Sequence, residues 1–197
     1  MRYKAFIYLL LLLWSCSPVA EAPEEKAAIG EQNPPLVAEN METSPVKLHK
    51  GWIACGGRWT AGEGASLGQG YADQLGAGVL NAGIAGEPLP GLLQRLPQLL
   101  GRKPQGLIIE IGQEDEALNA PPEAFQKHLT TLGKRLLKYP DLKVLILVSA
   151  QESAYRDAIT TFAESQKAFL LSDDSFAAPP TAAQHNALAE QVRQMLY

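Results

Sequence analysis

The chain has 197 residues, of which 46% are hydrophobic and 19% charged, and its formal net charge is -4 at pH 7. This acidic balance, together with the lack of a basic stripe interleaved with aromatic residues, argues against a nucleic-acid partner. Only two cysteines are present, Cys16 and Cys55.

The first fifteen residues have the pattern of a signal peptide. Arg2 and Lys4 precede an apolar run from Ala5 to Trp14. The run is too short to span a bilayer as a mature helix, which favours a cleaved signal over a membrane anchor. Removal of the signal removes these two positive charges and takes the formal net charge from -4 to -6.

The end of the apolar run carries a second signal. Leu13-Trp14-Ser15-Cys16 resembles a bacterial lipobox. The resemblance implies cleavage before Cys16 and attachment of several acyl chains there, which together anchor a protein stably to a membrane. Ser17 follows the cysteine where the enterobacterial sorting rule would need Asp for retention, so we expect the outer membrane. The alternative is an ordinary secretory signal in which the cysteine is incidental.

Residues 16–48 are predicted to be the lipidated cysteine and a disordered tether. The segment lacks apolar periodicity and is punctuated by prolines, namely Pro18, Pro23, Pro34, Pro35 and Pro45. Its roughly 32 residues give a mean reach on the order of 30 Å. Residues 49–197 are then predicted to form a single domain. If Cys16 is lipidated, Cys55 has no disulfide partner, and we interpret it as a buried core thiol.

In the domain, apolar runs alternate with segments of helical spacing. Strands are predicted at 52–55, 79–82, 107–111, 144–148 and 168–171, and helices at 68–75, 89–100, 122–138, 152–164 and 182–195. This β-α alternation predicts a three-layer α/β/α sandwich around a parallel sheet. Ligands of such sheets lie beyond the carboxyl ends of the strands.

The segment after the first predicted strand is the most informative. Gly56-Gly57-Arg58-Trp59-Thr60-Ala61-Gly62 resembles the first block of the SGNH/GDSL hydrolases, written Gly-Asp-Ser-Leu-Thr-Ala-Gly in that family. The resemblance implies a flavodoxin-like five-stranded sheet in the order 2-1-3-4-5. It places Arg58 at the position of the family's nucleophilic serine. A guanidinium carries no basic lone pair at neutral pH and cannot act as an acyl nucleophile.

The next two sequence motifs keep the family's glycines and spacing, but a residue that takes part in catalysis in the family is replaced. Asn81-Ala82-Gly83-Ile84-Ala85-Gly86 is similar to the family's Asn-Ala-x-x-Ser-Gly, so Gly86 corresponds to the glycine whose N–H serves the oxyanion hole. Gly112-Gln113-Glu114-Asp115 is similar to Gly-x-Asn-Asp, and Glu114 replaces the asparagine that donates a second oxyanion hydrogen bond. A carboxylate at this position accepts hydrogen bonds and repels a developing oxyanion. The neighbouring Gln113 could donate, although its side chain should point elsewhere.

The last block lacks both residues of the family's Asp-x-x-His pair. The helix beginning near Pro180 fixes the register, which puts Phe176 at the aspartate position and Pro179 at the histidine position. Of the three histidines, His49 precedes the first strand, His128 falls within a helix, and His185 comes six residues late. We therefore expect no catalytic residues, and we predict that Arg58 and Glu114 form a salt bridge in the former pocket. The rival hypothesis is that Arg58 binds an anionic ligand.

Three functions follow from these observations. The leading prediction is a lipid-anchored cell-envelope protein whose domain has lost hydrolase activity and binds or scaffolds an envelope ligand or protein. The alternative is a divergent esterase or lysophospholipase with a relocated active site; Ser66, Ser149, Ser153, Ser172 and Ser175 are the loop serines available. The third is a carbohydrate or peptide binder that stacks its ligand on Trp52, Trp59 or Tyr71.

The cleft residues we expect are Arg58, Trp59, Gly86, Gln113 and Glu114. We expect no metal and no cofactor.

Overall fold

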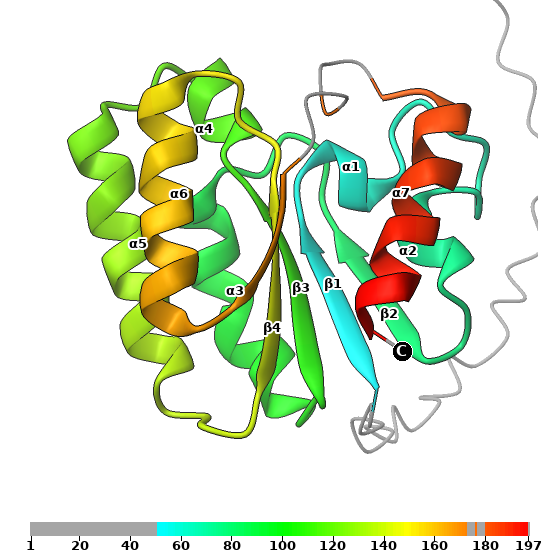
Figure 1. Ribbon diagram of the computed structural model, residues 1–197, viewed down its shortest axis with the longest axis horizontal. Helices are drawn as coiled ribbons and strands as arrows, with labels where there is room; N and C mark the ends of the chain where they lie inside the picture. Colours follow the sequence, from blue (N-terminus) through cyan, green and yellow to red (C-terminus); the bar gives the residue numbers. More distant parts are fainter. Residues whose placement is uncertain (1–50, 173–175, 177–179, 197) are drawn as a thin grey trace, which may run out of the picture. The chain divides into compact units, whose positions relative to one another are not determined.

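The computed structural model describes residues 51–172, 176 and 180–196. The predicted signal peptide, Cys16, the tether and Pro179 lie outside these residues. The described part contains a five-stranded parallel sheet in the order β2-β1-β3-β4-β5, with helices on both faces (Figure 1). This confirms the predicted fold class and strand order.

Each predicted strand is present, with its ends shifted by at most a residue. The strands are β1 (Trp52–Gly56), β2 (Val79–Gly83), β3 (Gly106–Ile111), β4 (Lys143–Val148) and β5 (Phe169–Ser172). Every residue of β1 and β3 is buried, as expected for the middle of a parallel sheet covered on both faces.

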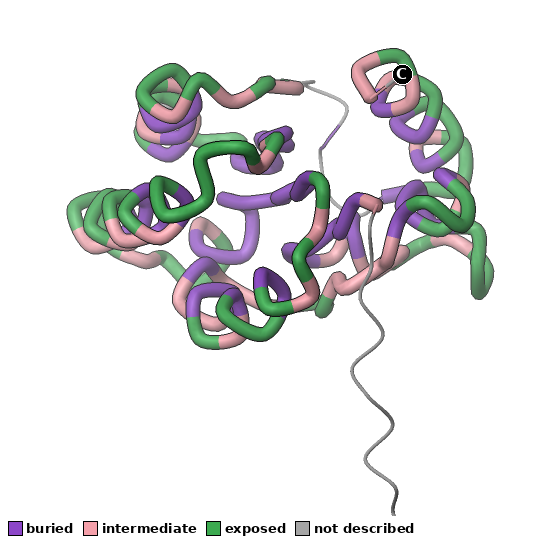
Figure 2. The backbone as a smooth tube through the Cα atoms, turned by 90° about the horizontal axis from the view of Figure 1, so that it is seen from below, coloured by how far each residue is buried: buried purple, intermediate pink, exposed green. Residues whose placement is uncertain are grey.

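Alternate residues of the strands serve two separate cores. On one face, Ile53, Ile109 and Ile146 pack under α3 (Leu89–Gly101), α5 (Pro122–Leu136) and α6 (Ser153–Gln166). On the other face, Ala54, Ile108 and Leu145 pack under α1 (Arg58–Ala61), α2 (Tyr71–Gln74) and α7 (Ala182–Leu196). Figure 2 shows the resulting pattern, in which the helices turn buried residues toward the sheet and exposed residues outward.

The observed helices differ from the predicted ones where the helices are only four or five residues long. The segment predicted as a helix over 68–75 is helical only in α2, because Gly68 adopts a left-handed backbone conformation and the chain turns there. Two helices of four and five residues, α1 and α4 (Gln113–Ala117), were not predicted from periodicity. A helix of one turn is too short to display a 3.6-residue repeat. None of the helices in the described residues has the length and apolar character needed to cross a membrane.

Candidate functional site

A tight turn at the carboxyl end of β1 positions the site. Gly56 has a φ of 136°, and a Cβ atom there would lie 2.3 Å from the carbonyl oxygen of Glu110. Only glycine combines this backbone conformation with so close an approach of β3. The turn places Arg58 at the first residue of α1, above the carboxyl end of the sheet.

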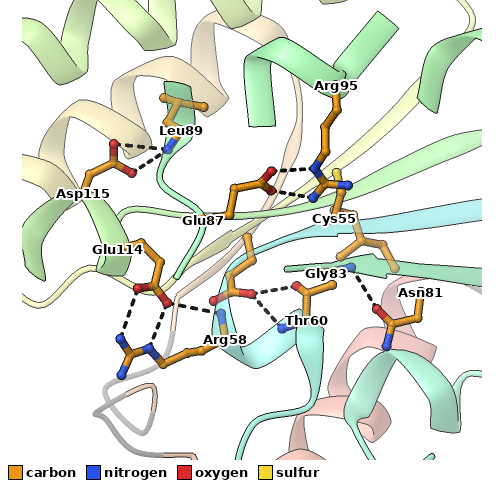
Figure 3. Close-up of polar contacts among 12 residues, drawn as sticks. Cys55, Arg58, Thr60, Asn81, Gly83, Glu87, Leu89, Arg95, Glu114 and Asp115 are labelled. Atoms are coloured by element: carbon orange, nitrogen blue, oxygen red, sulfur yellow. Dashed lines mark hydrogen bonds and ion pairs between the residues drawn. The ribbon is translucent and has the colours of Figure 1, made fainter. Parts of the chain in front are cut away.

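Arg58 and Glu114 form a bidentate ion pair, as the sequence predicted. Nε of Arg58 lies 2.9 Å from Oε1 of Glu114, and Nη2 lies 3.1 Å from Oε2 (Figure 3). The Glu114 side chain is 8% exposed and that of Arg58 is 22% exposed, so the pair lies at the rim of the domain and is only partly screened by water. Such fork-to-fork geometry fixes both side chains.

Backbone donors also converge on the Glu114 carboxylate. The N–H of Arg58 donates to Oε1 at 3.3 Å, and the backbone N–H of Gly86 further favours the charged carboxylate. The Arg58 guanidinium, with these backbone groups, holds the pKa of Glu114 below its usual range. The Glu114 carboxylate therefore accepts hydrogen bonds from backbone donors of two segments as well as from the Arg58 guanidinium.

The residues around the Glu114 side chain are tightly packed. Gly57, Glu110, Gly112, Glu114 and Ser149 line a small hollow there. Gly57 packs directly on Glu114, since a Cβ on Gly57 would lie 2.8 Å from Cγ of that side chain.

Glu110, which the sequence analysis missed, organises the turn from below. This buried residue of β3 accepts hydrogen bonds from the N–H of Trp59 at 3.3 Å, and from the N–H and the hydroxyl of Thr60, both at 2.7 Å. Burial raises the pKa of Glu110 to about 7, against the effect of these donors. The sequence feature that could have identified Glu110 is that it is the single charged residue in the apolar run 107–111.

Other carboxylates at this end of the sheet hold loops together. Asp115 accepts the backbone N–H of Leu89 with both oxygens, at 3.2 and 3.0 Å, and so caps α3 (Figure 3). Glu116 accepts the N–H groups of Gln151 at 2.7 Å and of Glu152 at 3.1 Å. These acidic side chains are thus structural.

A further, partly buried ion pair lies on the other side of the turn. Glu87 pairs with Arg95 of α3, whose Nε lies 2.6 Å from Oε1. The two side chains are 8% and 18% exposed, respectively, and Figure 3 shows them pointing toward each other. The pair ties the loop after β2 to α3.

His185 is not placed to act as a base. It is fully buried on α7; its Nδ1 accepts the backbone N–H of Tyr71 at 3.2 Å, and its Nε2–H donates to the carbonyl of Glu63 at 2.8 Å. Both ring nitrogens are therefore occupied in joining α7 to the α1–α2 region. His128 lies on α5, on the opposite face of the sheet from α1.

The aromatic rings considered as stacking surfaces are buried, which agrees with a core-packing role for Trp59 and leaves the third function without its stacking surface. Trp52, Trp59 and Tyr71 are 6%, 1% and 0% exposed, so none of them presents a ring to a ligand. Trp59 packs edge-on against Phe176, with ring centroids 5.0 Å apart, because the core beneath α1 is apolar. Trp59 is therefore a core residue and not a cleft residue. Gln113 is also buried, at 6% exposure.

The thiol of Cys55 and the hydroxyl of Ser149 are structural, and Ser175 lies outside the described residues. Cys55 is fully buried, and burial raises the pKa of its thiol to about 12. The buried Ser149 donates to the carbonyl of Ile111 at 3.1 Å and accepts the N–H of Gln113 at 3.2 Å. Among the described residues, no group of three or more His, Cys, Asp or Glu side chains is arranged to hold a metal ion.

Comparison with known proteins agrees with this fold. The family model of the GDSL-like lipase/acylhydrolases matches residues 51–196. The search of curated proteins returned no match.

Several solved structures are similar over the whole domain. The esterase EstA from Pseudoalteromonas sp. is 20% identical with a TM-score of 0.61, and the similarity covers 75% of this chain and 99% of that one. A putative lipolytic protein of the G-D-S-L family from Desulfitobacterium hafniense is 18% identical with a TM-score of 0.63, over 75% and 99%. TesA is 24% identical with a TM-score of 0.64, over 75% and 98%. At these identities the likeness shows the fold.

Proposed function

The chain belongs to the GDSL-like lipase/acylhydrolase family, and we propose that within this family it is a non-catalytic member that works as a binding or scaffold module of the cell envelope. One observation carries the proposal. The carboxylate of Glu114 accepts hydrogen bonds from the guanidinium and the backbone N–H of Arg58, and by resemblance to the family these two residues stand where the nucleophile and an oxyanion donor would be. With an arginine at the nucleophile position and a carboxylate among the oxyanion donors, the turn supports neither attack nor charge stabilisation.

The membrane attachment is a separate part of the proposal. The lipobox-like sequence ending at Cys16 supports an acylated amino terminus, and the proline-rich segment that follows supports a spacer between anchor and domain. We place the protein in the bacterial outer membrane on the strength of Ser17. Its partner is an envelope ligand or protein.

The alternative, a divergent esterase with a relocated site, has less support. Hydrolysis by a serine needs a base within hydrogen-bond reach of the nucleophile. Within the described ranges, no hydrogen bond joins a serine to a histidine, and His185 has both ring nitrogens engaged. We therefore rank this function second.

An activity test separates the two functions. The full chain, purified in detergent, is assayed with short-chain p-nitrophenyl and naphthyl esters and with a fluorophosphonate probe that labels activated serines. The esterase EstA serves as the positive control. We expect neither turnover nor labelling. Turnover that co-purifies with the protein and disappears on alanine substitution of one of its serines would establish the esterase.

One double variant provides a further control for the activity assay. Arg58→Ser/Glu114→Asn restores the family's serine and asparagine while leaving the base absent. We expect it to gain little or no turnover, because a serine without a base is a weak nucleophile.

The anchor is tested by the intact mass of the purified chain, which should show cleavage before Cys16 and added acyl groups. A Cys16→Ser variant should lack them.

A further inference from the structure

The end of the domain opposite the site carries an unpaired basic surface. Arg102 and Lys103 lie in the loop before β3, Lys138 lies in the loop before β4, and Lys143 begins β4. We call these four residues the basic rim. Lys103, Lys138 and Lys143 are exposed, and none of the four forms an ion pair within the described part of the chain.

Two residues of the basic rim, Lys103 and Lys138, line a hollow together with Tyr139. The hollow has a volume of about 400 Å³, and Gln105, Asp141 and Leu142 also line it. Tyr139 is 42% exposed. Lysine ammonium groups beside a half-exposed tyrosine suit an interface that is anionic at its surface and apolar beneath.

The chain enters the domain beside this rim. The carbonyl of Gly51 accepts the N–H of Gln105 at 2.8 Å, and the carbonyl of Gln105 accepts the N–H of Lys143 at 3.2 Å. In Figure 1 the start of β1 lies at the same end of the sheet as the loops before β3 and β4, whereas α1 and α4 lie at the other end.

The opposite end of the domain carries acidic side chains at or near its surface. They are Glu63, Glu116 and Glu152, in the loops and short helices at the carboxyl ends of the strands. An anionic surface would attract the basic rim and repel this end, which gives the domain a preferred orientation.

We propose that the basic rim binds the headgroups of anionic phospholipids, so that the domain lies with the amino ends of its strands on the membrane and the Arg58–Glu114 pair facing away. The inference rests on the proposed lipid anchor, which brings the rim close to the bilayer. The anchor supplies the affinity, and the rim sets the orientation. A lysine near an anionic surface contributes about fivefold to binding, and the contribution is screened by salt.

A fluorescent label at the rim tests this orientation. Tyr139→Cys is introduced into the full chain and labelled with a polarity-sensitive dye; Cys55 does not compete, because its thiol is buried. Leu67→Cys, at a fully exposed position in the loop between α1 and α2, provides the control label. The proteins are reconstituted into phosphatidylcholine vesicles with and without phosphatidylglycerol, and quenching by lipids brominated along their chains is measured.

We expect quenching of the label at position 139 in anionic vesicles only, its loss at high salt, and no quenching at position 67. Lys103→Glu/Lys138→Glu should lower the quenched fraction at least tenfold. Lys138→Glu alone should lower it several-fold, whereas Lys127→Glu, an equal charge change at an exposed position in the first half of α5, should not.

The outcomes separate the rim from the anchor. Protein that stays on both kinds of vesicle with no quenching at position 139 overturns the orientation and leaves the anchor intact. Protein that binds only anionic vesicles, with quenching at position 139, supports the rim and overturns the anchor. A dye shift at position 139 in detergent, equal to that on vesicles, would mean that the acidic tether covers the rim, and it would also overturn the inference.

Discussion

Thr60 and Glu110 meet inside the domain, where the backbone N–H and the hydroxyl of Thr60 both donate to one oxygen of Glu110. The hydroxyl of Tyr71 completes the chain of contacts at 2.9 Å from that of Thr60. This network fixes α1 on the sheet without any role for the residue at the nucleophile position. The shape of the turn therefore does not depend on the side chain at position 58.

The buried Glu110 should give the protein a pH-dependent stability. Its pKa is about 7 in the folded protein against 4.5 as reference, so the folded state binds the proton more tightly. The unfolding free energy should then fall as the pH rises through this interval, by a total on the order of 3 kcal/mol.

Urea unfolding of the natural protein and of Glu110→Gln, from about pH 5 to about pH 8, measures this effect. The difference between the two unfolding free energies should decrease with rising pH. Parallel curves would show that Glu110 titrates near its reference value in the folded protein.

Removal of Arg58 should destabilise the domain by leaving a carboxylate unpaired. Because the Arg58–Glu114 pair is partly exposed, we expect Arg58→Ala to cost about 1–3 kcal/mol of unfolding free energy at neutral pH. The lowered pKa of Glu114 means that this contribution is present above about pH 4.5 and is lost as the pH falls through the lowered pKa.

A double-mutant cycle with Glu114→Ala isolates the pair. Glu190→Ala, which breaks the exposed pair with Arg193, is the matched control and should change stability by less than about 0.5 kcal/mol. An equal loss from both pairs would contradict the role we assign to Arg58.

His185 should behave as a structural residue. His185→Ala removes the acceptor of the Tyr71 N–H and the donor to the Glu63 carbonyl, and it leaves a cavity against Trp59. We expect a loss of about 2–4 kcal/mol, measured by chemical denaturation. The adjacent Asn186→Ala, which removes an exposed side-chain hydrogen bond, should cost below about 1 kcal/mol. Similar losses in the two variants would be inconsistent with this assignment.

Thiol titration tests Cys55 and the anchor together. With its thiol fully buried and its pKa near 12, Cys55 should not react with Ellman's reagent in the folded protein. After unfolding in guanidinium chloride, one thiol should react if Cys16 is acylated and two if it is free. Rapid reaction of the native protein would contradict the burial of Cys55.

The sequence predicted the sheet well because its strands are short apolar runs. The ion pair could also be predicted, since family resemblance placed Arg58 and Glu114 at neighbouring positions. The sequence favoured core packing for Trp59 without identifying its partner, because the contact with Phe176 joins two segments that are far apart in the chain. Nor does periodicity reveal why Glu110 is tolerated in a strand: its partners, Trp59 and Thr60, come from a distant segment.

The Arg58–Glu114 pair also bears on how this domain can change over time. A substitution of Arg58 leaves the Glu114 carboxylate without its cation, and a substitution of Glu114 leaves the guanidinium without its anion. Each single substitution at the pair is therefore expected to lower stability, so the two positions should tolerate change more readily together than one at a time.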